Sequence, residues 1–165
     1  MSCTLILGVG NILMGDEGVG VWVIEHLQAH YTFPEEVQVL DGGTMGLDLL
    51  TYLEGVERLL VVDALDACQP PGTIVRLADD QIPAFLGRRK LSPHQIGLAD
   101  LLSVASLRGQ MPHQTVLIGV QPASLETKLG LSPTIQAQLP SILEKLLSEM
   151  ESWGYQISVR SCPPC

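Results

Sequence analysis

The stretch TLILGVGNILMGDEGVGVWVIEHLQAHY (residues 4–31) joins a short apolar run to a segment of helical period through a glycine-rich loop. Residues 4–9 form a continuous apolar run, which predicts a strand that is buried on both faces. Residues 18–31 show the spacing of a helix. A strand, a glycine loop and a helix in this order indicate an α/β fold.

The same alternation of apolar runs and helical segments continues along the chain. Strands are expected at 37–41, 58–65 and 113–121, and helices at 45–55, 94–109 and from Ser132, where Ser132 and Pro133 give a helix start and Pro140 predicts a kink or restart. A Pro-Gly turn leads into 72–78, which has the partial alternation of an edge strand. The pattern indicates one α/β domain whose mainly parallel sheet is covered on both faces.

The charge of the chain excludes some classes of partner. Eighteen acidic residues face nine basic ones, for a formal net charge of −9. Nucleic acid is therefore not expected as a partner, because binding phosphate needs the opposite sign, whereas metal cations or a basic polypeptide are compatible. The apolar runs are too short to span a bilayer and the N-terminus has no signal-peptide pattern, so we expect a cytoplasmic protein without a membrane segment.

The glycine loop does not match a nucleotide site. A dinucleotide fingerprint needs a third glycine, and Leu13 stands at that position after Gly8 and Gly10. A phosphate loop of the Walker type needs lysine and a hydroxyl, and Asp16 and Glu17 replace them. Two unit charges at about 4 Å interact by about 4 kcal/mol at an effective dielectric of 20, so these acids would repel a phosphate.

Acidic residues follow the first three predicted strands at the edge where α/β folds place their sites. Asp16 and Glu17 follow the first, Asp41 the second, and Asp63 lies in the end of the third, where an apolar residue is expected. One of the two acids after the first strand is expected to cap the following helix, which we assign to Asp16. A buried Asp63 needs a metal, a cation or hydrogen-bond donors, and a structural role capping a loop stays open.

Histidine supplies a further ligand type for this edge. His94 lies at the start of a predicted helix beside a loop, and with Glu17 and Asp63 it would give two oxygens and one nitrogen with open coordination positions. Such a set suits Zn²⁺ or Ni²⁺. His26 and His30 have the i, i+4 spacing of a zinc-binding helix, but they lie far from the strand ends and are expected on a solvated face.

The four cysteines are expected to be reduced thiols, since the chain has no export signal. Only Cys162 and Cys165, in the terminal CPPC, have a spacing of chemical interest. That spacing suits metal binding or redox chemistry, whereas two prolines at a chain end favour a disordered segment.

Five motifs together resemble those of the [NiFe]-hydrogenase maturation endopeptidases. They are GVGNILMGDEGVG (8–20), LDGGTMGLDLL (40–50), LLVVDAL (59–65), SPHQIGLADLL (92–102) and LIGVQP (117–122). The resemblance runs from about residue 4 to 155. It implies a single doubly wound α/β domain over 1–155, with about five mostly parallel strands in a twisted sheet, one antiparallel edge strand and helices on both faces; residues 156–165 are expected to be a flexible tail.

The resemblance also implies which residues form the site. Glu17, Asp63 and His94 match the family's metal-binding and catalytic positions. Asp41 matches the family pattern as well, and with Gly42, Gly43 and Asp16 it is expected to contact substrate or to support the site residues. Gly42 and Gly43 allow close backbone approach.

The implied function is removal of a C-terminal peptide from the precursor of the hydrogenase large subunit after nickel insertion. Nickel is then brought by the substrate, and zinc or another divalent ion would fit the same site in the isolated protein. The metal would act as a Lewis acid or activate a water, or the carboxylates would act as general acid and base while the metal only docks the substrate. The protein is expected to be a monomer. The alternative is a non-catalytic nickel-sensing or nickel-delivery chaperone with the same metal site.

Overall fold

The computed structural model describes residues 3–88 and 93–161, the side chains of 93–96 excepted, and places five strands in one sheet of order β3–β1–β4–β6–β5. The strands are β1 (Cys3–Val9), β3 (Val37–Gly43), β4 (Val56–Ala64), β5 (Ile74–Ala78) and β6 (Gln114–Val120). The pairings β1–β3, β1–β4 and β4–β6 are parallel, and β5 runs antiparallel to β6 at the edge. The prediction of a mostly parallel sheet with one antiparallel edge strand is confirmed.

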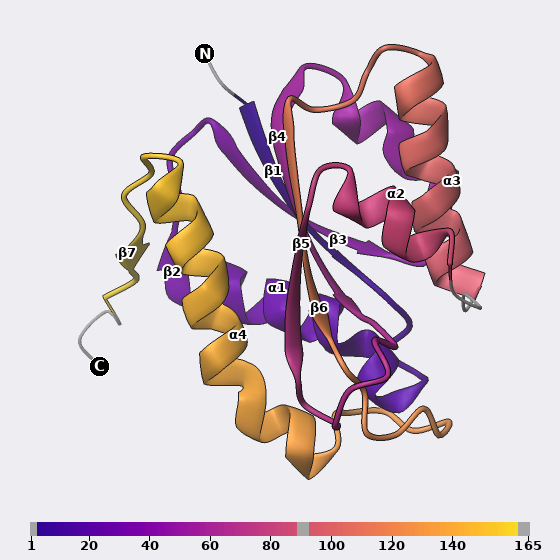
Figure 1. The fold of residues 1–165 in the computed structure, drawn as a ribbon. Coiled ribbons are helices and arrows are strands. Elements are labelled where there is room, and N and C mark those ends of the chain that lie inside the picture. The colour runs from indigo at the N-terminus through magenta and orange to yellow at the C-terminus, as the bar shows by residue number, and fades with distance from the viewer. Residues whose placement is uncertain (1–2, 89–92, 162–165) are drawn as a thin grey trace.

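Helices cover both faces of this sheet (Figure 1). One face carries α1 (Val19–His30) and α4 (Pro133–Ser152), and the other carries the 3₁₀ helix η2 (Gly46–Leu53), α2 (Gln81–Leu86) and α3 (Pro93–Leu107). Alternate residues of the central strands divide between the two layers. In β1, Ile6 packs into the core under α1 and α4, whereas Leu5 and Leu7 pack into the core under η2 and α3. The chain is therefore a three-layer α/β domain with two apolar cores.

Local helix geometry differs from the sequence prediction in three places. The helix expected at 45–55 is the 3₁₀ helix η2, and the first helix is preceded by a 3₁₀ turn, η1 (Gly15–Gly18); such short 3₁₀ pieces are common as connectors. The expected restart at Pro140 is absent, because α4 continues through it. Pro140 and Gln136 are both exposed, so water can satisfy the Gln136 carbonyl that loses its helical partner.

The C-terminal segment returns to the body of the domain. After α4, the Tyr155 hydroxyl forms a 2.8 Å hydrogen bond with Thr4 Oγ1 in the first strand. Two further residues, β7 (Ser158–Val159), pair antiparallel with β2 (Tyr31–Thr32) directly after α1. The tail expected from residue 156 therefore begins with a strand pairing, and its last four residues lie outside the described part of the chain.

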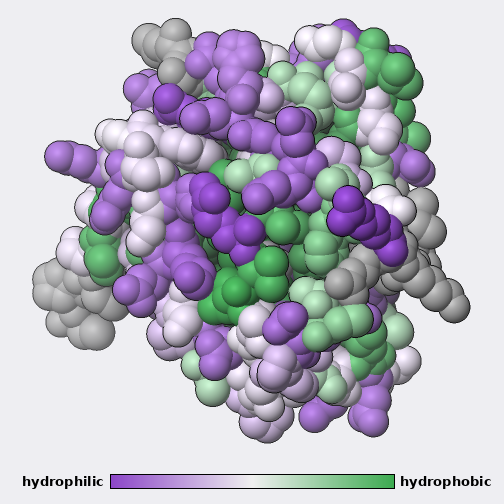
Figure 2. All heavy atoms as spheres, in the orientation of Figure 1, coloured by the Kyte–Doolittle hydropathy of each residue, from purple (hydrophilic) through white to green (hydrophobic). Residues whose placement is uncertain are grey.

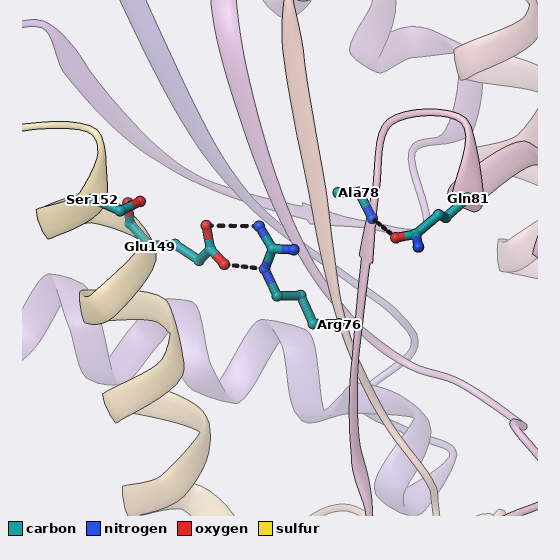
Figure 3. Close-up of polar contacts among 5 residues, drawn as sticks. All are labelled: Arg76, Ala78, Gln81, Glu149 and Ser152. Atoms are coloured by element: carbon teal, nitrogen blue, oxygen red, sulfur yellow. Dashed lines mark hydrogen bonds and ion pairs between the residues drawn. The ribbon is translucent and has the colours of Figure 1, made fainter.

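The edge strand β5 makes polar contacts with its neighbours (Figure 3). Arg76 forms an ion pair and hydrogen bonds with Glu149 of α4, one of them 3.3 Å from Nη2 to Oε2. This hydrogen bond with Glu149 is the main cause that raises the pKa of Arg76. The backbone N–H of Ala78 donates to Gln81 Oε1 at 2.9 Å. Arg76 and α4 line an open groove of about 390 Å³, and Figure 2 shows a small group of hydrophobic residues between hydrophilic ones there.

No helix among the described residues is both long enough and apolar enough to cross a membrane.

Candidate functional site

The glycine loop after β1 lies where three strands end side by side. In the sheet register, Gly8 of β1 stands between Asp41 of β3 and Val62 of β4. Gly10 donates its backbone N–H to the carbonyl of Gly43 at 2.9 Å, which ties the loop to the end of β3. The carboxyl ends of β3, β1 and β4 therefore meet at one edge, as expected for a site in an α/β sheet.

Two glycines of this loop are required by its close packing. Gly10 has φ +132°, and a Cβ there would lie 2.0 Å from the Glu17 carbonyl oxygen. Gly20, in the first turn of α1, has no room for a Cβ, which would lie 2.2 Å from the Val62 carbonyl oxygen and 2.5 Å from that of Val9. The glycines thus let η1 and α1 approach the strand ends, and they fix where Glu17 stands.

Asp16 is a buried structural carboxylate. Its side chain accepts hydrogen bonds from the backbone N–H groups of Ala123 and Ser124, each at 2.9 Å. It also accepts from the backbone N–H of Ser132 at 2.7 Å and from the Ser132 hydroxyl at 2.8 Å. Ser132 is the N-cap of α4, where its Oγ accepts from the N–H of Ile135. Asp16 therefore holds the loop between β6 and α4.

The expected cap of the first helix is wrong. The N-cap of α1 is Gly18, which makes no side-chain cap hydrogen bond, and Asp16 instead supports the cap of α4, more than 100 residues away in sequence. The physical reason is tertiary. Four donors converge on Asp16 from one distant loop, whereas the start of α1 is already buried against β1 and β4.

Glu17 and Asp63 are the two other acids buried at this edge. Glu17 lies in η1 with 8% of its surface exposed, and η1 packs against β4. Asp63 lies next to the end of β4, pairs in register with Gly119 and is fully buried. By strand alternation it belongs to the same face as Val61, which packs in the core under η2 and α3. Carboxylates buried in this way need partners, and both have interactions in the structure.

His94 belongs to the first turn of α3, but its side chain lies outside the described residues. The neighbouring backbone shows where this turn is. Gly97 lies close to Gly46, since a Cβ added at Gly97 would lie 3.3 Å from the Gly46 Cα. Val9, Gly43 and Gly97 also line one small cavity of about 40 Å³. The first turn of α3 therefore lies at the carboxyl ends of β1 and β3, beside the strand ends that carry the acids.

Asp41 lies at the same edge but is exposed. Its Oδ1 accepts the backbone N–H of Gly43 at 2.9 Å, which closes a local turn, and Gly43 has φ +44°. Gly42 is buried, and a Cβ there would lie 2.7 Å from the Leu7 side chain. Close packing therefore explains a glycine at position 42. The contact of Asp41 with substrate stays a prediction.

No metal site is formed by the described side chains alone. Among residues 3–88 and 97–161, no three His, Cys, Asp or Glu side chains are arranged to hold an ion. The expected ligand set includes His94, so this result does not test it. The residues present have the right chemistry, since carboxylate oxygen and imidazole nitrogen both bind borderline divalent ions.

The loop that Asp16 holds, which packs against the glycine loop, was not predicted from the sequence. Residues 121–131 run beside the glycine loop, with Gly15 N–H donating to the Lys128 carbonyl and Lys128 N–H to the Leu13 carbonyl. Leu13, Leu125 and Leu129 on these two loops are 50–62% exposed. Leucine in a polar, glycine-containing loop was the available signal, but nothing in the sequence paired the two loops.

Comparison with known proteins places the chain in a class. A family model described as hydrogenase maturation protease matches residues 21–149. The chain belongs to this family, and it is therefore a peptidase of hydrogenase maturation. This result agrees with an α/β fold whose buried acids gather at the strand ends.

Individual relatives and a solved structure agree with the family assignment. The chain is 42% identical over 153 residues to the hydrogenase 2 maturation protease of Escherichia coli K12, covering 92% of this chain and 93% of the relative. It is also 42% identical over 160 residues to the hydrogenase expression/formation protein HupD of Bradyrhizobium diazoefficiens, covering 96% and 83%. The solved structure of the hydrogenase maturating endopeptidase HybD from E. coli superimposes with a TM-score of 0.91 at 41% identity, covering 96% and 98%.

Proposed function

We propose that this protein is the endopeptidase that removes the C-terminal peptide from the nickel-loaded precursor of a [NiFe]-hydrogenase large subunit. The observation that carries the proposal is the pair of buried acids, Glu17 and Asp63, on neighbouring elements at the carboxyl edge of the sheet. Family membership supports the peptidase activity and favours it over a nickel-delivery chaperone. The protein acts as a monomer in the cytoplasm.

Recognition depends on nickel carried by the substrate. Glu17, Asp63 and His94 would complete the coordination of an ion that the precursor's cysteines already hold. Two carboxylate oxygens and one imidazole nitrogen suit Ni²⁺, and in the isolated protein the same residues suit Zn²⁺ or another divalent ion. Burial of both acids favours an ionic partner, because a charged carboxylate in a site with little water is stabilised by a nearby cation.

Two mechanisms agree with this arrangement. In the first, the substrate's nickel positions the scissile bond and acts as a Lewis acid or activates a water, while Glu17, Asp63 and His94 hold the ion. In the second, Glu17 and Asp63 transfer protons as general acid and base, and the metal only docks the precursor. Both use the same residues, so a substitution alone does not separate them.

The decisive experiment compares the precursor with and without nickel. Purified protein is incubated with each form, and the large subunit is weighed by mass spectrometry. We expect the nickel-loaded precursor to lose a C-terminal peptide and the nickel-free form to stay intact. Equal cleavage of both forms would overturn metal recognition while keeping the peptidase. An unchanged mass of the nickel-loaded precursor would overturn the proposed function itself.

A further inference from the structure

Exposed hydrophobic side chains gather around the edge of the sheet that carries Glu17 and Asp63. Eight large hydrophobic side chains are exposed in the described part of the chain, and five of them follow the carboxyl ends of β1, β3 and β6. These five are Leu13, Met45, Leu47, Leu125 and Leu129. Single exposed leucines are ordinary, but a group of them at one edge indicates a surface that another molecule covers.

Three of the five belong to two loops that lie side by side (Figure 1). Leu13 lies in the glycine loop, and Leu125 and Leu129 lie in the loop between β6 and α4. Lys128 donates its backbone N–H to the Leu13 carbonyl at 3.0 Å, and Gly15 donates its own to the Lys128 carbonyl at 2.9 Å. The three leucines are 59%, 50% and 62% exposed. We name these three side chains the leucine surface.

Asp16 fixes the loop that carries two of these leucines. Its carboxylate accepts the backbone N–H of Ser124 at 2.9 Å and that of Ser132 at 2.7 Å, on either side of Leu125 and Leu129 in the sequence. The Asp16 backbone N–H also donates to the Ser124 carbonyl at 3.1 Å. A surface held in this way loses less conformational freedom when a partner binds than a free loop would.

The leucine surface is continuous with the proposed peptidase site. Leu13 stands four residues before Glu17 in the same loop, and η1, which carries Glu17, packs against β4, which carries Asp63. Met45 and Leu47 follow β3, on the other side of the site, because β1 and β4 lie between β3 and β6 in the sheet. A molecule that reaches the two acids therefore also lies over exposed apolar side chains.

We propose that the leucine surface binds an apolar patch on the folded body of the hydrogenase large-subunit precursor, next to the C-terminal segment that enters the site. The inference rests on the proposed function and extends it from the cleaved segment to the body of the substrate. Membership of the family supports a protein substrate, and a precursor that already holds nickel is folded around it. The exposed Glu126 and Lys128 between the leucines give the polar rim that is usual around an apolar contact.

The test measures docking and chemistry separately in the full-length protein. Nickel-loaded precursor is cleaved in single-turnover reactions with an increasing excess of protein, which gives the half-saturating protein concentration and the maximal rate. Since the leucines bind substrate without acting on the scissile bond, L13S/L125S/L129S should raise the half-saturating concentration at least about 10-fold. The maximal rate should stay within about twofold of the wild-type value.

The matched control is L107S/V159S. Leu107 and Val159 are 88% and 71% exposed, more than any member of the leucine surface, but they lie at the end of α3 and in β7. This variant should keep both wild-type values. If the triple variant does not fold, as judged by urea denaturation, L129S replaces it, with an expected rise of about threefold in the half-saturating concentration.

Three kinetic outcomes would overturn the proposal. They are an unchanged half-saturating concentration in the triple variant, an equal rise in the control, and a fall in the maximal rate alone. Sedimentation adds a fourth: a wild-type dimer that the triple variant dissociates, with cleavage unchanged, would make a second copy the occupant.

Failure of the proposed function gives a different result, which is an uncleaved precursor even with the wild-type protein. Binding of the same nickel-loaded precursor to immobilised protein, measured by interferometry, then tests the leucine surface by itself. Weaker binding by the triple variant than by wild type and control would support the docking proposal. Equal binding, or no binding to the wild type, would overturn it.

Discussion

The two ends of α1 show opposite ways of holding chemistry-bearing side chains. At its start, Asp16 and Glu17 are buried, and distant loops fix their surroundings. At its end, His26 is half-buried and His30 is exposed, and the C-terminal segment is joined to this end by a two-residue strand pairing and two hydrogen bonds from Arg160. The same helix therefore connects a buried acidic edge with a more exposed end.

Because of this difference, substitutions at the two ends of α1 should differ in their effects on stability and on cleavage. At the start of α1, changing one of two adjacent acids should affect stability and changing the other should affect catalysis. At the end of α1, substitutions should leave both nearly unchanged.

The largest effect is expected for E17Q. Gln keeps the size of the side chain but removes its charge, so metal recognition or proton transfer is lost. Cleavage of nickel-loaded precursor should fall at least about 10³-fold, or about 4 kcal/mol in the activation barrier. The rate is measured from the mass of the large subunit over time. E25Q removes an exposed acid of α1 and should cleave at the wild-type rate; equal rates for the two variants would remove Glu17 from the site.

The next effect is on stability, for D16A. The substitution leaves the N–H groups of Ala123, Ser124 and Ser132 without their buried acceptor, and we expect a loss of about 3 kcal/mol in the free energy of unfolding. Urea denaturation followed by circular dichroism measures it. D100A, at an exposed position of α3, should change stability by less than about 0.5 kcal/mol. A D16A protein as stable as D100A would contradict the structural role of Asp16.

A smaller effect is expected at the other end of α1, for truncation after Ile157. It removes β7 and the two hydrogen bonds of Arg160 but keeps Tyr155 and its bond to Thr4. The lost hydrogen bonds are exposed, so we expect the free energy of unfolding of the metal-free protein to change by about 1 kcal/mol or less. The cleavage rate should be unchanged. Truncation after Trp153, which also removes Tyr155, is the comparison and should cost more. Loss of cleavage after truncation at Ile157 would show that the C-terminal end of α1 affects the site at its N-terminal end.

The smallest effect is the pH dependence that His26 contributes. Because burial, and then His30, lower its pKa in the folded state, the unfolded chain binds the proton more strongly. Stability is therefore fully present above pH about 6.5 and falls as the pH drops below that value. Wild type should lose slightly more stability than H26Q between pH 7 and 5, as measured by urea unfolding of metal-free protein. An identical pH dependence would show that His26 titrates as it does in the unfolded chain.

Much of the fold follows from sequence periodicity. The runs around Leu5, Leu59 and Leu117 are continuous and apolar because those strands are buried on both faces, and this pattern predicts a parallel sheet directly. The edge strand was recognisable from its partial alternation after a Pro-Gly turn. The 3₁₀ geometry of η2 and the pairing of β2 with β7 were not, since each depends on tertiary contacts of a few residues.

The site was predictable only in part. The position of Glu17 and Asp63 after buried strands predicted that both lie at one edge of the sheet, since strand ends of a parallel sheet share one edge, and the structure buries both acids there. The role of Asp16 was missed because its donors come from residues 123–132, and no local pattern announces a bond across that separation. The three-dimensional relation of His94 to the two acids stays a prediction.

The contacts on β5 also limit how this protein meets other chains. An edge strand normally offers unpaired N–H and C=O groups to any extended segment, which promotes aggregation. Here the Ala78 amide donates its hydrogen bond to Gln81, whereas the charged Arg76 pairs with Glu149 of α4 on one face of the sheet. A second copy would have to displace Gln81 from the Ala78 amide to extend the sheet at this position. The contact at Ala78 thus protects part of the sheet edge from strand addition.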